Sequence, residues 1–278
     1  MSTDGAGTGR ECFVDGLSVF MHEQGRGPAV LLLHGFPFTH RSFAAVAGPL
    51  AQGRRVLAVD LPGFGDSDCP PAFSYDVVAY ADAMAELLRA EQAAPAAVVA
   101  HGFGAAIAVA MAVLQPDRVR RLVLIGGVLY PQPVPSLLRL AIGESLFAPW
   151  FWRLAFTRKH LAVQLQDAFL DADLAGGGLV DQLWEGLARP GGREAARRVF
   201  SASTRLDPVA ELPPRVTCPC LVLWGESDRV VPPAFSRRLA MEIHGARGVE
   251  IARSGHCPHQ ERPELFLEAV IPFLAEGE

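Results

Sequence analysis

The sequence predicts an α/β fold with a mostly parallel central sheet, helices on both faces of the sheet and an inserted helical cap. Short apolar runs alternate with Ala-rich helical segments, which is typical of a parallel sheet covered on both sides. A long stretch without strand-like runs then interrupts this alternation. The 278 residues are 50% hydrophobic and 20% charged, which excludes a disordered chain and allows a large core.

Along the chain, residues 12–14 and 17–21 flank Asp15-Gly16 and predict an antiparallel hairpin at the sheet edge. The strands that follow are expected to be buried because they are apolar throughout. Their residue ranges are 29–33, 56–59, 97–99, 122–125, 221–224 and 249–251. Helical spacing of apolar residues predicts helices at 42–52, 75–90, 105–114, 234–243 and 263–274.

Residues 129–207 lack strand-like runs and contain a Trp/Phe cluster and a triple-glycine turn. A segment of this length in a compact domain has helices of its own. We therefore expect an α/β core at 11–128 and 208–278 and a helical cap at 129–207. The polar residues 1–10 are expected to form a flexible tail.

Charge and cysteine content limit the partners. The net charge of −5 gives no general attraction for nucleic acid. Five cysteines without a disulfide spacing predict free thiols in a reducing, cytoplasmic compartment. Charged residues and Pro149 interrupt the apolar stretch 136–156, so no membrane association is expected. Cys218-Pro219-Cys220 has the wrong spacing for zinc, and we expect no metal and no cofactor. The sequence leaves open whether the protein forms a homodimer.

Unusual residues follow the predicted parallel strands, at the sheet edge where open α/β sheets bind ligands. These segments are His34-Gly35-Phe36-Pro37, the run 60–67, His101-Gly102-Phe103-Gly104, Gly225-Glu226-Ser227-Asp228 and Ser254-Gly255-His256. Together and in this order they resemble the cap-containing α/β-hydrolase superfamily, over the whole chain after residue 10.

The resemblance implies specific roles. Phe36 and Phe103 would supply the two backbone N–H groups of an oxyanion hole. Asp228 would be the acid and His256 the base, in the chain order nucleophile, acid, base. The nucleophile position itself holds Gly102, where relatives carry serine, aspartate or cysteine. Glycine keeps the strained turn at little cost but provides no attacking atom.

No serine, threonine or cysteine lies between Tyr80 and Ser136 to replace the missing nucleophile. Cys257 is a weaker candidate, because adjacent residues on a loop tend to point apart and the oxyanion donors are aimed at position 102. His259 is expected to donate a structural hydrogen bond. Covalent acyl-enzyme chemistry through position 102 is excluded.

Candidate pocket residues are His34, His101, Trp150 and Trp152. The aromatic cap residues between 146 and 156 either line an apolar cavity or pack the cap onto the core. An apolar or aromatic carbonyl compound is therefore the expected substrate class.

Three functions remain open. The first is an enzyme in which His256 and Asp228 act as general base without a covalent intermediate, in a lyase, isomerase, cyclase or direct hydrolysis reaction. The second is a serine ester or C–C hydrolase inactivated by replacement of serine with Gly102. The third is a non-catalytic protein that binds a ligand or partner.

Overall fold

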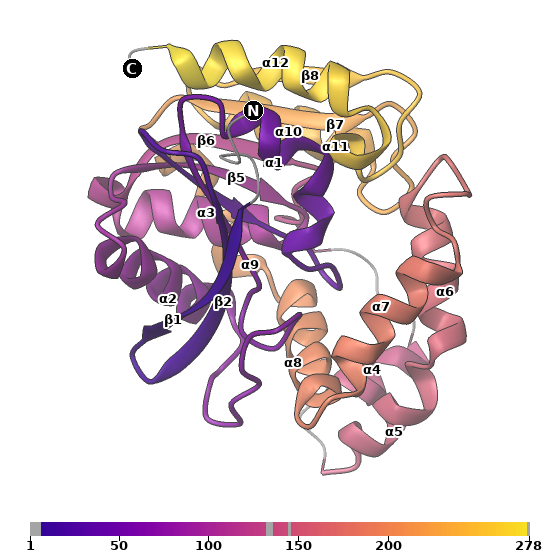
Figure 1. The fold of residues 1–278 in the computed structure, drawn as a ribbon. Coiled ribbons are helices and arrows are strands. Elements are labelled where there is room, and N and C mark those ends of the chain that lie inside the picture. The colour runs from indigo at the N-terminus through magenta and orange to yellow at the C-terminus, as the bar shows by residue number, and fades with distance from the viewer. Residues whose placement is uncertain (1–6, 132–135, 144–145, 277–278) are drawn as a thin grey trace.

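The computed structural model describes residues 7–131, 136–143 and 146–276. Its centre is a sheet of eight strands in the order β1-β2-β4-β3-β5-β6-β7-β8 (Figure 1). The strands are β1 Thr8–Val14, β2 Leu17–Gln24, β3 Ala29–Leu33, β4 Arg55–Val59, β5 Ala96–His101, β6 Val119–Ile125, β7 Cys220–Gly225 and β8 Arg247–Ile251. The pairs β1·β2 and β2·β4 are antiparallel and the other five neighbouring pairs are parallel, so the predicted mostly parallel fold is confirmed.

Helices cover both faces of the sheet. The core helices are α1 Ala44–Leu50, α2 Val77–Ala90, α3 Phe103–Leu114, α10 Pro233–Glu242, α11 Pro258–Glu261 and α12 Pro263–Ala275. Short 3₁₀ turns occupy His40–Phe43, Pro116–Arg118 and Pro213–Arg215. Helices α1 and α12 share one apolar cluster with the sheet, whereas α2, α3 and α10 belong to the other.

Strand β3 shows why the sequence pattern is apolar rather than alternating. Val30 and Leu32 pack in the cluster of α1 and α12, and Leu31 and Leu33 pack in the cluster of α2 and α3. All four side chains are fully buried. Successive side chains of a strand point to opposite faces, so a strand covered on both sides is apolar at every position.

The expected N-terminal tail is too long. Strand β1 begins at Thr8, and Arg10 pairs with Met21 of β2 in the ladder. The Arg10 guanidinium lies 2.9 Å from the Glu23 carboxylate and also pairs with Glu91 at the end of α2. These ion pairs hold the first, polar residues of the strand, which give no apolar signal in the sequence. Residues 1–6 lie outside the described part.

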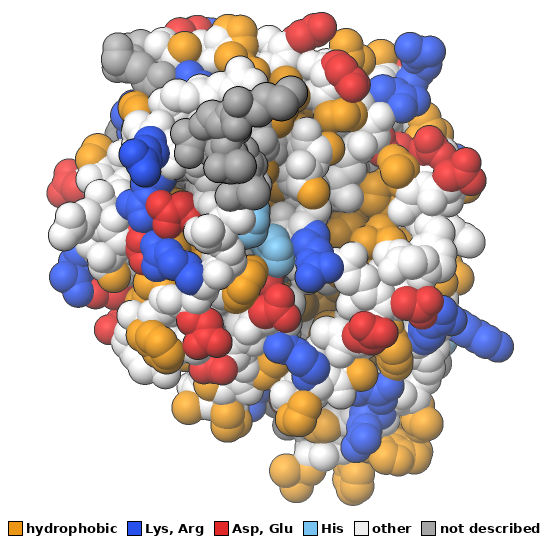
Figure 2. All heavy atoms as spheres, in the orientation of Figure 1, with side chains coloured by type: hydrophobic (Ala, Val, Ile, Leu, Met, Phe, Trp, Pro, Cys, Tyr) orange, Lys and Arg blue, Asp and Glu red, His pale blue; other side chains and the backbone are white. Residues whose placement is uncertain are grey.

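The segment predicted as a cap contains helices α4 Ser136–Ile142, α5 Ala148–Ala155, α6 Arg158–Ala168, α7 Gly177–Ala188 and α8 Gly192–Thr204. They gather on one side of the sheet domain in Figure 1, and the short α9 Asp207–Ala210 leads back to it. No helix among the described residues is both long and apolar enough to span a membrane. Acidic and basic side chains are interspersed over the face drawn in Figure 2.

Some aromatic and large apolar residues of the cap are buried in its interior, and others are exposed on its surface. Trp152 is buried and stacks on Phe156, with ring centroids 4.5 Å apart. Leu146, Phe147 and Trp150 are exposed on the outside of the cap. The inner residues therefore pack the cap, and the outer ones face away from the core.

Candidate active site

A sharp turn at Gly102 joins strand β5 to helix α3. Gly102 has φ +55° and ψ −118°, a conformation that residues with a Cβ adopt only under strain. Its N–H donates to the Ile125 carbonyl at 2.9 Å, and its carbonyl accepts from the Val128 N–H at 3.0 Å. The backbone thus holds the turn without any contribution from a side chain.

The space above Gly102 is open. A Cβ placed on this residue would meet no atom closer than 3.4 Å, the distance to both His256 Nε2 and Gly35 Cα. The imidazole edge of His256 therefore faces the position that a side chain at residue 102 would occupy.

His256 and Asp228 form a buried, hydrogen-bonded pair. His256 Nδ1 lies 2.9 Å from Asp228 Oδ2. Asp228 Oδ1 accepts from the N–H groups of Val230 and Val231 at 2.9 and 2.8 Å. A carboxylate only accepts, so this contact places a proton on Nδ1, and in the neutral imidazole the lone pair of Nε2 is then directed toward Gly102. This is the arrangement that a general base requires.

Gly126, which follows strand β6, makes room for this pair. A Cβ on Gly126 would lie 2.9 Å from His256 Nδ1 and 3.3 Å from Asp228 Oδ2, and its φ is +50°. Any other residue would push against the imidazole and the carboxylate. Gly126 was not among the residues predicted from the sequence, although the Gly126-Gly127 pair directly after a buried strand was a visible signal.

The backbone of His256 is fixed from two sides. Its N–H donates to the Ala168 carbonyl at the end of cap helix α6, at 2.8 Å. Its carbonyl accepts from His101 Nε2 at 3.0 Å. The base is therefore positioned jointly by the cap and by the strand that precedes Gly102.

Glu261, which was also not among the residues predicted from the sequence, adds a second link between the cap and the loop that carries His256. This buried carboxylate accepts from the Gly255 N–H at 2.7 Å and, through its other oxygen, from the Leu170 N–H at 2.8 Å. Nothing in its sequence context distinguishes it from a surface glutamate. Its role depends on a contact between segments far apart in the chain.

The two expected oxyanion donors lie beside the turn at Gly102, which we call the elbow. Phe36 and Phe103 both line the cavity that contains Gly102 and His256. Phe103 is the first residue of α3, and the first N–H groups of a helix have no partner within it. The partial positive charge of the helix N-terminus favours a developing negative charge here.

The cavity above the elbow has a volume of about 310 Å³, within the range of small-molecule sites. Its apolar lining comes from both the core, with Phe38 and Val230, and the cap helices, with Leu165 and Phe200. Polar residues reach it chiefly from the cap side; they are Gln164, Asp167, Ser203 and Thr204, with Arg229 from the core.

The four predicted pocket residues are placed elsewhere, so those predictions are corrected. His34 is fully buried, with Nδ1 2.9 Å from the Gly35 carbonyl and Nε2 accepting from the Leu61 N–H at 2.9 Å. His101 packs behind His256, with ring centroids 4.5 Å apart. Trp150 is 58% exposed, and Trp152 is buried inside the cap. The two histidines brace the site from behind, and the tryptophans belong to the cap.

Burial keeps these bracing histidines neutral. It lowers the pKa of His34 to about 4 and holds the pKa of His101 well below its usual value. His259 is also buried, and its pKa is lowered to about 3. Neither ring nitrogen of His259 has a hydrogen-bond partner among the described residues, so the prediction of a structural donor was wrong. It packs instead on Phe43, 4.9 Å away.

Cys257 does not supply the nucleophile in this structure. Its side chain is fully buried and does not line the cavity. Burial raises the pKa of its thiol well above the usual value. A reactive cysteine needs the opposite, a lowered pKa and access to substrate.

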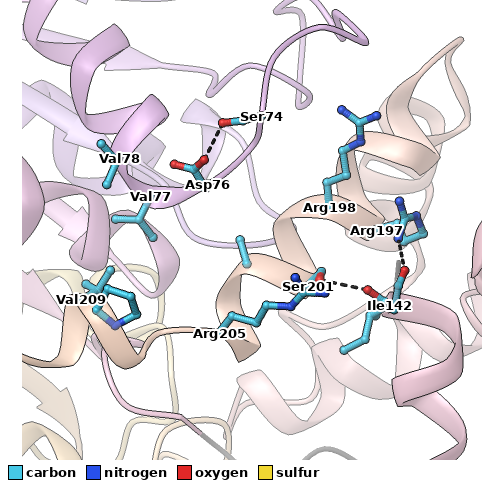
Figure 3. Close-up of a pocket in the computed structure, with 13 residues that line it drawn as sticks. Ser74, Asp76, Val77, Val78, Ile142, Arg197, Arg198, Ser201, Arg205 and Val209 are labelled. Atoms are coloured by element: carbon cyan, nitrogen blue, oxygen red, sulfur yellow. Dashed lines mark hydrogen bonds between the residues drawn. The ribbon is translucent and has the colours of Figure 1, made fainter. Parts of the chain in front are cut away.

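A larger cavity of about 540 Å³ lies between the start of α2 and helix α8 (Figure 3). Arg197 there pairs with Glu194 at 2.7 Å, and Ser201 donates to the Ile142 carbonyl at 3.0 Å. These polar groups are thus satisfied by the protein itself. Neither Gly102 nor His256 lines this cavity, and we assign the chemistry to the smaller one. Within the described ranges, no group of three or more His, Cys, Asp or Glu side chains could hold a metal.

Comparisons with known proteins agree with this fold. The family model described as "Alpha/beta hydrolase family" matches residues 30–269. The chain is 31% identical over 281 residues to 2-hydroxymuconate semialdehyde hydrolase of Pseudomonas sp. (strain CF600), covering 97% of this chain and 95% of the relative. It is 30% identical to a pimeloyl-(acyl-carrier protein) methyl ester esterase of Neisseria meningitidis serogroup B, over 89% and 93% of the two chains. A meta-cleavage product hydrolase of Pseudomonas fluorescens has a similar structure, with a TM-score of 0.84, 25% identity and coverage of 97% and 98%.

Proposed function

The chain belongs to the α/β hydrolase family, and from this premise we propose that it is an enzyme that works without a covalent nucleophile. His256, held by Asp228, acts as general base on a water molecule or on a substrate proton. The Phe36 and Phe103 N–H groups bind the resulting oxyanion or enolate. Gly102 occupies the position at which the family resemblance places the nucleophile.

One observation carries this proposal. The base is complete, with Nε2 directed at Gly102, while position 102 offers only space. Keeping the pair has a structural cost, because Gly126 must remain a glycine and Asp228 must be buried with its hydrogen bonds satisfied. A pair maintained at this cost supports a role in catalysis.

The proposed chemistry needs no group that the site lacks. A water molecule or a substrate carbon acid above Gly102 loses its proton to His256 Nε2. Negative charge then develops on the carbonyl oxygen and is stabilised by the two backbone donors. Positioned general-base catalysis contributes about 100- to 10,000-fold, and each oxyanion donor about 100- to 1000-fold.

The substrate class is a small, apolar or aromatic carbonyl compound. The apolar lining of the cavity and the volume of about 310 Å³ support this size and character. The names of two relatives, a semialdehyde hydrolase and a methyl ester esterase, also describe carbonyl compounds. Five unpaired cysteines support a reducing, cytoplasmic compartment as part of the same proposal.

The test is turnover by the unmodified chain over a panel of aryl ketones, β-diketones and aryl esters, compared with His256→Ala. We expect the variant to lose at least about 100-fold in rate. His244→Ala is the matched control, because His244 is exposed and lies outside the cavity. Equal rates for the chain and His256→Ala would refute the proposal. Binding of a small molecule without any turnover would favour a non-catalytic binding protein.

A second candidate is a serine hydrolase in which serine has been replaced by Gly102. The observation that favours it is the space for a Cβ at 3.4 Å, together with the retained positive φ. This candidate expects an inert unmodified chain and a strongly active Gly102→Ser variant that reacts with a fluorophosphonate. It fails if the unmodified chain shows turnover that depends on His256.

A further inference from the structure

We propose that the outer surface of the cap docks on a membrane surface of anionic lipids. The docking surface consists of exposed apolar residues on helices α4 and α5 and on the link between them, accompanied by basic residues. We call the apolar set the outer cap face, and its members are Leu140, Leu146, Phe147, Trp150 and Leu154. None of these residues lines the cavity that contains Gly102 and His256. Docking is therefore independent of the proposed reaction.

Helix α5 turns one side toward the interior of the cap and the other toward solvent. Phe147, Trp150 and Leu154 are spaced three and four residues apart, which places them on one side of the helix. Each of them is more than half exposed. Ala148 and Trp152, on the other side, are buried. The rest of the described chain thus leaves an aromatic and apolar side of α5 uncovered.

The uncovered surface continues beyond α5. Leu146 is 96% exposed, and Leu140 is more than half exposed on α4, which packs against α5. In Figure 2, hydrophobic side chains gather at the lower end of the molecule, where α5 lies in Figure 1. Single exposed apolar residues are normal on a protein surface, whereas a group of this kind marks contact with a protein or a membrane.

Basic residues accompany this face. Residues 139–159 contain three arginines and one lysine against one acidic residue, although the whole chain has a net charge of −5. The basic residues, all exposed, are Arg139, Arg153, Arg158 and Lys159. Arg158 is paired with Asp181 at 2.5 Å, so the other three give the face its positive charge. Positive charge beside an exposed apolar surface complements anionic lipid headgroups.

The same charge argues against a second copy of this chain as the partner. A symmetric dimer formed through the outer cap face would pair this surface with itself and bring the basic residues of both chains together. Like charges across an interface oppose association. Trp and Phe next to Arg and Lys are instead typical of helices at a membrane interface.

Docking on a bilayer is distinct from crossing it. Helix α5 has eight residues and is about 12 Å long, far less than the hydrocarbon core of about 30 Å. Charges oppose a spanning helix, but on a helix that lies on the surface they contact headgroups and water. The proposal therefore departs from the expectation of no membrane association, which considered only a segment that crosses the bilayer.

The experiment measures co-sedimentation with two kinds of vesicle: phosphatidylcholine and phosphatidylglycerol in equal parts, and phosphatidylcholine alone. We expect the unmodified chain to bind the mixed vesicles at least about tenfold more tightly at low salt, because each basic residue near an anionic surface contributes about fivefold. High salt should remove this preference, since it screens the charges.

Trp150 reports the contact directly, because the other three tryptophans are buried or half-buried. Its fluorescence emission should shift to shorter wavelength when mixed vesicles are added. Trp150→Phe keeps an aromatic ring at this position, so it should keep most of the binding and lose the shift.

Leu146→Asp tests the apolar part of the face. Because Leu146 is 96% exposed, we expect the variant to keep its melting temperature and to bind mixed vesicles at least about tenfold more weakly, as expected when one leucine side chain is no longer buried. Met241→Asp is the matched control, since Met241 is 79% exposed on α10, outside the face. It should bind like the unmodified chain.

Arg153→Glu tests the charge. It should weaken binding to mixed vesicles at least about tenfold, because it replaces an attraction with a repulsion, and leave binding to phosphatidylcholine unchanged. Arg26→Glu makes the same change at an exposed position between β2 and β3 and is the control. If Leu146→Asp does not fold, Arg153→Glu and the Trp150 emission still decide.

Three results would overturn the proposal: equal or no binding to the two kinds of vesicle, binding that survives both Leu146→Asp and Arg153→Glu, or no vesicle binding with a dimer that Leu146→Asp disperses in analytical ultracentrifugation. The last result would assign the outer cap face to a second copy of this chain. None of these measurements depends on turnover, so docking and the proposed function can fail separately.

Discussion

Placing a side chain at position 102 should change stability and reactivity by separate, calculable amounts. In Gly102→Ala the new Cβ meets no atom closer than 3.4 Å, so the loss of stability comes from the backbone alone. A residue with a Cβ at φ +55° is strained by about 1–3 kcal/mol, and the reduced entropy of the unfolded chain offsets about 0.4–1 kcal/mol. The expected net loss is about 1–2 kcal/mol, or about 2–8 °C in melting temperature.

Gly102→Ser should show the same loss of stability, because it adds the same Cβ. It should differ in chemistry, since its hydroxyl would lie next to His256 Nε2 and face the Phe36 and Phe103 donors. We expect it to be labelled by a fluorophosphonate and to hydrolyse a para-nitrophenyl ester at least about 1000-fold faster than Gly102→Ala.

Differential scanning fluorimetry measures the change in melting temperature. Mass spectrometry after exposure to the fluorophosphonate measures the labelling. A Gly102→Ala variant as stable as the unmodified chain would contradict this expectation, because the turn would then not be strained for a side chain. A Gly102→Ser variant that folds and remains unlabelled would contradict it as well. In that case the base and the oxyanion donors would not be aimed at position 102.

Three further predictions address the surroundings of the base. Gly126→Ala should reduce turnover at least tenfold while the protein stays folded, because its Cβ would lie 2.9 Å from His256 Nδ1; unchanged steady-state rates would contradict the geometry. Glu261→Gln places an amide NH₂ group against N–H groups that donate to Glu261. It should lower the free energy of unfolding by about 1–3 kcal/mol in chemical denaturation, and lower kcat more than it raises KM. Glu264→Gln, at an exposed position, is the control. Burial holds the pKa of His259 at about 3, below the value of about 6.5 in an unfolded chain. As the pH falls, the unfolded state therefore takes up a proton before the folded state does. The free energy of unfolding should decrease as the pH drops from about 6.5 toward 3. Between pH 7.5 and 5, the free energy of unfolding of His259→Phe should therefore fall by about 2 kcal/mol less than that of the unmodified chain, as measured by thermal melts. An identical pH profile for the two proteins would count against this.

The fold was predictable because its determinants are local and repeated. Fully apolar runs identified strands such as Ala29–Leu33, and helical spacing identified Val77–Ala90 to within a few residues. Strand β1 was only partly predicted. Its first residues are polar, and the ion pairs of Arg10 with Glu23 and Glu91 that hold it join segments distant in sequence.

The site residues that directly follow a predicted strand could be identified from the sequence, because their residue type and position are characteristic together. His256, Asp228 and Gly102 meet as expected, and Phe36 and Phe103 lie beside them.

Residues that act through contacts between distant segments were harder to predict. Glu261 acquires its role only where the cap meets the loop that carries His256. Gly126 was visible as part of a Gly-Gly pair, but the close approach of His256 and Asp228 that requires glycine there joins three separate segments. Likewise, the choice between cavity wall and cap interior for Trp152 depends on how helix α5 is rotated, which composition does not determine.

The central claim is catalysis by His256 without a covalent intermediate, and single-turnover kinetics with intact-protein mass spectrometry tests it most directly. With a substrate found in the carbonyl panel, we expect product to form while the protein mass stays unchanged at every time point, and we expect His256→Ala to abolish this product. A transient mass increase equal to a substrate fragment, or product formation at the same rate in His256→Ala, would contradict it.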